Sequence, residues 1–166
     1  RTRKLQEWAE TAPVNRVEPA AAEKGGGGLG IITSSTSYQY VKEVFGDAVS
    51  ILKLGMTNPL PVKLVRDFAA RVDRLVVIEE LDPVIENHCK ALGLKVSGKD
   101  FLPLEGEFSQ NLIAQRMGEE VYEGRTIDDP IPPRPPVMCA GCPHRGLFYT
   151  LSKHKCTVLG DIGCYT

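Results

Sequence analysis

Apolar runs and segments with helical spacing alternate along this chain of 166 residues. Runs at residues 28–34, 50–54 and 75–79 are rich in branched aliphatic side chains, as expected of buried strands. Helical spacing follows at residues 38–45, 62–72 and 84–92, and a last helix is centred on residues 112–117. Strands that alternate with helices predict an α/β fold, a three-layer α/β/α sandwich.

Two weaker strand signals complete the predicted sheet. Residues 14–18 alternate in polarity and are joined to the run at 28–34 by the glycine-rich sequence AEKGGGG, which predicts an antiparallel hairpin. A phosphate-binding loop is disfavoured there, because these glycines precede a strand, whereas such a loop follows a strand and opens a helix. Residues 94–97 form a short further strand.

The ends of the chain differ from this central pattern. Residues 1–11 have helical spacing, either as the remnant of a preceding domain or as a helix packed on the sheet. Five prolines between residues 128 and 137 predict a stiff spacer. We therefore divide the chain into a helical remnant (1–12), an α/β domain (13–128), a proline-rich linker (129–137) and the start of another domain (138–166).

Composition excludes several classes of protein. Twenty basic and twenty-one acidic residues give a net charge of −1, without the basic block expected of a nucleic-acid-binding protein. The apolar runs are far shorter than the ~20 residues that span a bilayer. No signal segment is recognisable, so we expect a cytoplasmic protein without membrane or nucleic-acid partners.

In open α/β sheets, ligands bind at the carboxyl ends of the strands. Here those ends are followed by the loops at residues 34–37, 55–58 and 79–82, and the helix at residue 84 is expected to take Asp82 as its N-cap. Glu79 and Glu80 are possible acid/base groups, but neighbouring strand residues point to opposite faces. Solvated or interface carboxylates are the favoured interpretation.

Candidate chemistry is concentrated after the spacer. The five cysteines are an odd number, and three of them, Cys139, Cys142 and Cys164, lie close together in sequence. This pattern favours metal or redox chemistry over a secreted disulfide framework. A helix at residues 145–153 and a strand at 156–160 are predicted to return Cys164 towards the other two. Spacing alone leaves zinc and an iron–sulfur cluster equally favoured, with a dithiol redox pair as a third possibility.

A resemblance narrows these alternatives. The sequences CAGCPHRGLFYTL and GDIGCYT closely resemble the α subunit of indolepyruvate:ferredoxin oxidoreductase, a thiamine-diphosphate enzyme. The likeness extends over GIITSSTSYQYVKEVF, LKLGMTNPLP, VVIEELDPVIE and PPRPPVMCAGCPHR. It implies a transketolase C-terminal-domain-like mixed sheet with one antiparallel strand for residues 13–128, and the beginning of a thiamine-diphosphate-binding domain for 138–166.

The resemblance also implies roles for seven residues. Ligands of an iron–sulfur cluster would be Cys139, Cys142 and Cys164. Residues lining the cofactor pocket would be His144, Asp161, Gly163 and Tyr165. In the complete enzyme, thiamine diphosphate with Mg²⁺ and iron–sulfur clusters serve the oxidative decarboxylation of an aryl pyruvate. Coenzyme A takes the acyl group, ferredoxin takes the electrons, and a β subunit is the partner.

For this segment alone we expect a mainly structural role in domain docking, with no activity and none of these cofactors bound. The alternative is a non-catalytic scaffold module that binds zinc or a cluster.

Overall fold

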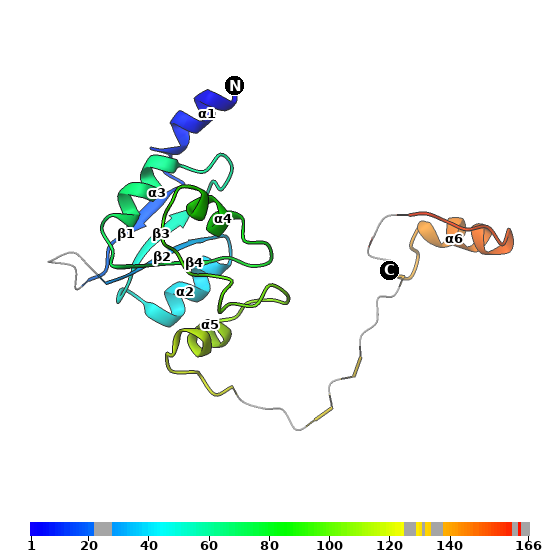
Figure 1. Cartoon of the computed structure of the whole chain (residues 1–166). Coiled ribbons are helices and arrows are strands. Elements are labelled where there is room, and N and C mark those ends of the chain that lie inside the picture. Colours follow the sequence, from blue (N-terminus) through cyan, green and yellow to red (C-terminus); the bar gives the residue numbers. More distant parts are fainter. Residues whose placement is uncertain (22–27, 125–128, 131, 134–137, 161–162, 164–166) are drawn as a thin grey trace. The chain divides into compact units, whose positions relative to one another are not determined.

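The computed structural model describes residues 1–21, 28–124, 129–130, 132–133, 138–160 and 163. The chain divides into two compact units, Arg1–Glu123 (the first unit) and Gly124–Thr166 (the second unit). Figure 1 labels the helices and strands of both.

One mixed sheet of four strands is the centre of the first unit. Its order is β1-β3-β2-β4. The strands are β1 (Arg16–Glu18), β2 (Leu29–Ser34), β3 (Ser50–Leu54) and β4 (Arg74–Ile78). β2 is parallel to β3 and to β4, whereas β1 is antiparallel to β3. The α/β class and the single antiparallel strand are therefore confirmed.

The predicted hairpin between the first two strands is wrong, because β1 pairs with β3. β2 is buried along its four inner residues and has a parallel neighbour on each side. A β-branched, apolar strand of this kind is best covered in the middle of a sheet. β1 has only three residues and an exposed start, which suits an edge. The intervening residues 22–27 lie outside the described part of the chain.

The described residues of the first unit form five helices. They are α1 (Thr2–Ala9), α2 (Ser37–Phe45), α3 (Val62–Ala69), α4 (Val84–Ala91) and α5 (Gln110–Met117). The predicted helices agree, although α3 ends earlier than its apolar spacing suggested. α5 has clear end signals: the Ser109 hydroxyl accepts a hydrogen bond from the Leu112 N–H at 3.2 Å, and Gly118 ends the helix at φ +79°.

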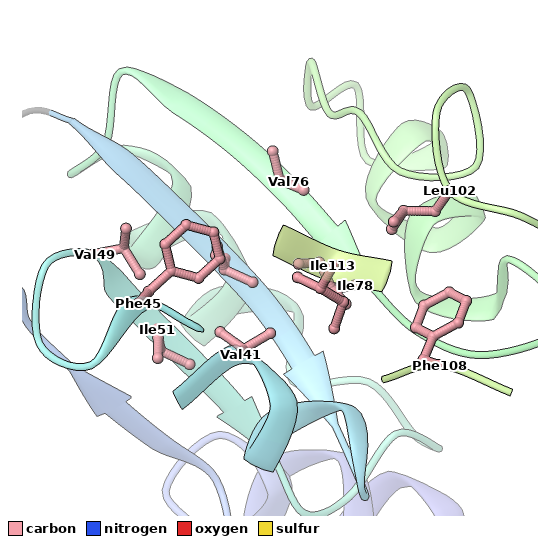
Figure 2. Close-up of a cluster of buried hydrophobic side chains, with 10 residues drawn as sticks. Val41, Phe45, Val49, Ile51, Val76, Ile78, Leu102, Phe108 and Ile113 are labelled. Atoms are coloured by element: carbon pink, nitrogen blue, oxygen red, sulfur yellow. The ribbon is translucent and has the colours of Figure 1, made fainter. Parts of the chain in front are cut away.

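Alternation along the strands produces two apolar faces. Ile31, Ile51 and Ile78 lie in one core with Val41 of α2 and Ile113 of α5, and Figure 2 shows this cluster. Residues adjacent to these along the strands belong to the other core. They are Ile32, Leu52 and Val77, and they pack with Phe68 of α3 and Ile85 of α4. A period of two thus places α2 and α5 on one side of the sheet and α3 and α4 on the other.

The predicted strand at residues 94–97 is reduced to a single parallel bridge between Val76 and Ser97. Ser97 accepts a hydrogen bond from the Val77 N–H at 2.8 Å and donates one to the Leu75 carbonyl at 3.2 Å. The chain then turns at Gly98, where an added Cβ would lie 2.5 Å from Glu86 Oε2. A side chain at position 98 would therefore clash with the buried Glu86 carboxylate.

The second unit contains one described helix, α6 (His144–Lys153), and none of its residues is buried. The strand predicted at residues 156–160 is wrong. These residues are exposed, 95% in the case of Leu159, and they pair with no strand in the described part of the chain. A strand needs a neighbour for its backbone N–H and C=O groups, and no described segment supplies one here. Among the described helices of either unit, none has the length and apolar character needed to cross a membrane.

Candidate functional site

Cys139 and Cys142 lie in a tight turn that leads into α6. The Cys142 N–H donates to the Cys139 carbonyl at 3.1 Å, and Gly141 has a φ of +76°, a conformation that side chains disfavour. Arg145 holds the turn from the first turn of the helix. Its guanidinium donates to the carbonyls of Met138 at 2.6 Å and Cys139 at 3.1 Å. The C-x-x-C spacing therefore places both cysteines in one ordered turn.

The thiols of this turn are accessible. Cys139 is exposed, Cys142 is half-buried, and both are free, as are the other two described cysteines, Cys89 and Cys156. A tetrahedral zinc site or a four-iron cluster needs four ligands, usually thiolates or imidazoles. The turn provides two suitable sulfurs. No group of three or more potential metal ligands occurs among the described residues.

The other candidate residues of the second unit are partly described. His144 is the first residue of α6 and is exposed, with its ring centroid 6.2 Å from that of Phe148. Gly163 is half-buried. Asp161, Cys164 and Tyr165 lie outside the described residues. The structure thus places Cys139 and Cys142 in one turn and His144 at the helix start that follows, and the three do not form a metal-binding group.

In the first unit, Glu79 at the end of β4 caps the helix that follows. Its buried carboxylate accepts hydrogen bonds from the backbone N–H groups of Ile85 and Glu86, both at 2.9 Å. Asp82, the expected N-cap, contributes only its backbone carbonyl, to the N–H of Val84 at 2.8 Å. Burial raises the pKa of Glu79, and the two N–H donors oppose that shift. Glu79 is a helix cap, which the sequence pattern did not reveal.

A second buried carboxylate lies beside this cap. Glu86 is 1% exposed and accepts hydrogen bonds from Lys90 Nζ at 2.6 Å and from the backbone N–H of Lys99 at 2.8 Å. The Lys99 ammonium donates to the carbonyls of Glu79 at 2.7 Å and Pro103 at 3.0 Å, and burial lowers its pKa. Buried charges need such partners. The i, i+4 spacing of Glu86 and Lys90 was the one signal available in the sequence.

Glu80, the residue after Glu79, binds the backbone at Phe108, which packs in the core of α2 and α5. One of its carboxylate oxygens accepts a hydrogen bond from the Phe108 N–H at 2.8 Å. The two adjacent glutamates, which follow β4, therefore each hold a different segment. Neither has the geometry of an acid/base pair.

The three loops expected to border a ligand site surround two cavities at the carboxyl ends of β2, β3 and β4. One, of about 490 Å³, is lined by Arg16 and Lys53 and is called the cationic cavity below. The other, of about 400 Å³, is lined by carboxylates that include Glu80 and Asp82 and is called the acidic cavity. Three residues line both: Ser34, Ser35 and Thr57.

Comparison with known proteins relates the chain to one kind of subunit. It is 32% identical to the indolepyruvate oxidoreductase subunit IorA of Archaeoglobus fulgidus, 34% to that of Pyrococcus abyssi and 33% to that of Methanothermobacter marburgensis. These alignments cover 98–99% of this chain and 28–30% of the relatives, so the chain spans less than a third of the length of the proteins it matches. No protein-family model matches the chain, and no solved structure matches it significantly.

Proposed function

The chain is related by sequence, over nearly its whole length, to one segment of the indolepyruvate oxidoreductase subunit IorA, and we propose that it serves as the equivalent segment of such an oxidoreductase. The observation that carries this proposal is an identity of 32–34% that extends over 98% of the chain or more. An alignment of this extent includes both the sheet domain and the cysteine turn.

The proposed reaction of the complete enzyme is the oxidative decarboxylation of an aryl pyruvate such as indolepyruvate. The bond between the 2-oxo carbon and the carboxylate breaks, carbon dioxide leaves, and the acyl group forms a thioester with coenzyme A. The two electrons released reduce two molecules of ferredoxin by one electron each, and one proton is released. We place this enzyme in the cytoplasm, with a β subunit as its partner.

Thiamine diphosphate with Mg²⁺ would supply the electron sink for decarboxylation, and iron–sulfur clusters would carry the electrons. In this chain, Cys139 and Cys142 are the proposed cluster ligands, together with Cys164. Support for Cys139 and Cys142 comes from their accessible thiols, which lie in a turn that Arg145 fixes through hydrogen bonds to two carbonyls. The proposed pocket-lining residues are His144, Asp161, Gly163 and Tyr165.

For the domain at residues 13–128 we propose a structural role, the docking of neighbouring domains and subunits. Its buried carboxylates, Glu79 and Glu86, are already bound to backbone N–H groups and to Lys90. Groups held in this way stabilise the fold. The linker at 129–137 would join this domain to a thiamine-diphosphate domain that starts at residue 138.

The test uses the complete polypeptide that contains this sequence, purified without oxygen together with its partner subunit. We expect reduction of ferredoxin that requires both indolepyruvate and coenzyme A. Cys142→Ser should abolish this activity, whereas Cys156→Ser, a change at an exposed free cysteine outside the turn, should retain it. Absence of 2-oxoacid-dependent ferredoxin reduction in the unmodified enzyme would contradict the assignment, and full activity of Cys142→Ser would contradict the ligand role.

A further inference from the structure

The two cavities lie at the carboxyl ends of the parallel strands. β2 is followed by α2, whose residues pack in one core, and β4 is followed by α4, whose residues pack in the other. The chain therefore leaves these neighbouring parallel strands towards opposite faces of the sheet. Ligands of open α/β sheets bind outside the carboxyl ends of strands at such a point. The acidic cavity is bordered by residues that follow β2 and β4. The cationic cavity is bordered by residues at the carboxyl ends of β2 and β3, and β3 is followed by α3, which packs in the same core as α4.

Two cations line the cationic cavity. Arg16 and Lys53 are direct partners in the antiparallel pairing of β1 and β3, so their side chains lie on the same face of the sheet. Arg16 Nη2 lies 3.4 Å from Glu18 Oε1 and 3.5 Å from the Tyr38 hydroxyl. Lys53 forms no ion pair with the described residues, and its ammonium lies 5.9 Å from the centre of the Tyr38 ring. No carboxylate lines this cavity.

Neutral hydrogen-bond donors complete the lining. The hydroxyl-bearing residues Ser34, Ser35 and Thr57 border the cavity, and the chain bends into α2 at Ser35, which has a φ of +52°. No side chain caps the start of α2, where the backbone carbonyls of Ser35 and Thr36 accept hydrogen bonds from the N–H groups of Tyr38 and Gln39. Next to Lys53 in the sheet is Thr33, whose buried hydroxyl has no hydrogen-bond partner among the described residues. The two cations and the hydroxyl groups of the lining together favour an oxyanion.

The acidic cavity is lined by hydrogen-bond acceptors with negative charge. It shares Ser34, Ser35 and Thr57 with the cationic cavity, so the two adjoin. One carboxylate oxygen of Glu80 is bound by Phe108, whereas the Asp82 carboxylate accepts no hydrogen bond from the described residues. Carboxylates with free lone pairs accept hydrogen bonds from hydroxyl groups. A ligand that fits both cavities has an anionic group at one end and hydroxyl donors at the other.

We propose that the two adjoining cavities bind a phosphorylated polyhydroxyl small molecule of the sugar-phosphate class. Its phosphate lies between Arg16 and Lys53, and its hydroxyl groups donate to Asp82 and Glu80. A phosphate matches the cationic end better than a carboxylate does, because it offers three terminal oxygens and close to two charges to donors from three elements. This binding site does not depend on the oxidoreductase assignment.

The test is isothermal titration calorimetry of the full chain with three probes: ribose 5-phosphate, inorganic phosphate and ribose. We expect ribose 5-phosphate to bind more tightly than inorganic phosphate, and ribose to show no binding. Arg16→Gln and Lys53→Gln should each weaken ribose 5-phosphate by roughly tenfold or more, the usual effect of losing one charge-assisted contact. Arg74→Gln, at the exposed amino end of β4, is the matched control and should bind as the unmodified chain does.

Asp82→Asn separates the two halves of the site. It should reduce the advantage of ribose 5-phosphate over inorganic phosphate and leave the affinity for inorganic phosphate unchanged or slightly higher. Circular dichroism checks folding. Lys53→Gln keeps the test valid if Arg16→Gln does not fold, because Lys53 has no ion pair to lose. Absence of ribose 5-phosphate binding, or equal binding by Lys53→Gln and the control, would overturn the proposal. Equal affinities for the two phosphates, or an unaffected Asp82→Asn, would overturn the placement of the hydroxyl groups.

Discussion

The two units use similar sequence patterns with different results. In the first, amphipathic helices bury residues such as Val41 and Phe68 against both faces of a sheet. In the second, α6 has the same kind of amphipathic pattern, yet it buries none of its residues, and Leu147 is 56% exposed. An apolar stripe therefore becomes a packed layer only where a complementary surface is present. The candidate cofactor residues Cys139, Cys142 and His144 lie in the second unit, whose described residues provide no such surface for α6.

The reactive groups of the two units differ in the same way. Cys89 of the first unit is packed in the core with Ile85 and Phe68, and burial raises the pKa of its thiol to about 11. Such a thiol remains protonated and inert at neutral pH. Cys139 and Cys142 are accessible in their turn. Sequence composition counts these cysteines equally, but the structure separates one buried packing residue from two accessible thiols.

The largest expected difference concerns apolar burial. Ile51→Ala should lower the free energy of unfolding of the first unit by about 2–5 kcal/mol, because Ile51 is fully buried beneath α2. Leu147→Ala on α6 should change it by less than about 0.5 kcal/mol. Urea denaturation of the full chain, followed by circular dichroism, measures both. Equal losses for the two variants would show that α6 is packed as tightly as the sheet.

Glu79→Gln should have the next largest effect. An amide has one acceptor oxygen, so one of the two N–H groups at the start of α4 would lose its partner, at a cost of about 2 kcal/mol. Asp82→Asn is the matched control, since only the backbone carbonyl of Asp82 binds α4, and it should change stability by less than about 0.5 kcal/mol. A larger loss of stability in Asp82→Asn than in Glu79→Gln would show that Asp82 is the cap.

The pH dependence of the same pair sharpens this test. Burial raises the pKa of Glu79 above its ordinary value of 4.5, so the folded state keeps the proton to a higher pH than the unfolded state does. The stability of the unmodified chain relative to Glu79→Gln is therefore greatest below pH 4.5 and declines as the pH rises through the folded-state pKa. Urea denaturation of both proteins across this range measures the difference. A difference that increases with pH would show that the N–H donors outweigh burial.

A smaller effect is expected where α1 meets α3. The Glu10 carboxylate accepts hydrogen bonds from the backbone N–H groups of Lys63 at 3.0 Å and Leu64 at 2.8 Å, and so caps α3 from another helix. Glu10→Gln should cost about 1 kcal/mol. Glu7→Gln, an exposed change within α1, the helix that Glu10 ends, should have no measurable effect in the same urea titration. Equal stabilities of the two variants would show that the cap contributes nothing.

Most of the sheet domain could be predicted from its sequence, because its elements follow from local patterns. The alternation in Ile31–Ile32 and Ile51–Leu52 marks two buried faces, and glycine or serine marks the ends of α5. The partner of β1 could not be predicted in the same way. Strand pairing depends on which edge of the sheet is free, and loop length alone does not specify it.

The helix caps and the second unit show a different limit of prediction from sequence. Glu79 and Glu10 cap helices from 6 and 53 residues away in sequence, outside the window in which local N-cap signals are read. The apolar run at residues 156–160 reads as a strand, but the structure gives it no partner in the described chain. The C-x-x-C turn, in contrast, was predictable, because two intervening small residues at Ala140 and Gly141 allow the turn directly.

The most direct test of the functional account is the metal content of the complete polypeptide containing this sequence, purified without oxygen. Iron and acid-labile sulfide are measured in the unmodified protein, in Cys139→Ser with Cys142→Ser, and in the control Cys156→Ser. The account predicts iron with sulfide in the unmodified protein and in the control, and a loss of about one cluster in the double variant. Stoichiometric zinc without sulfide, or unchanged iron in the double variant, would contradict it.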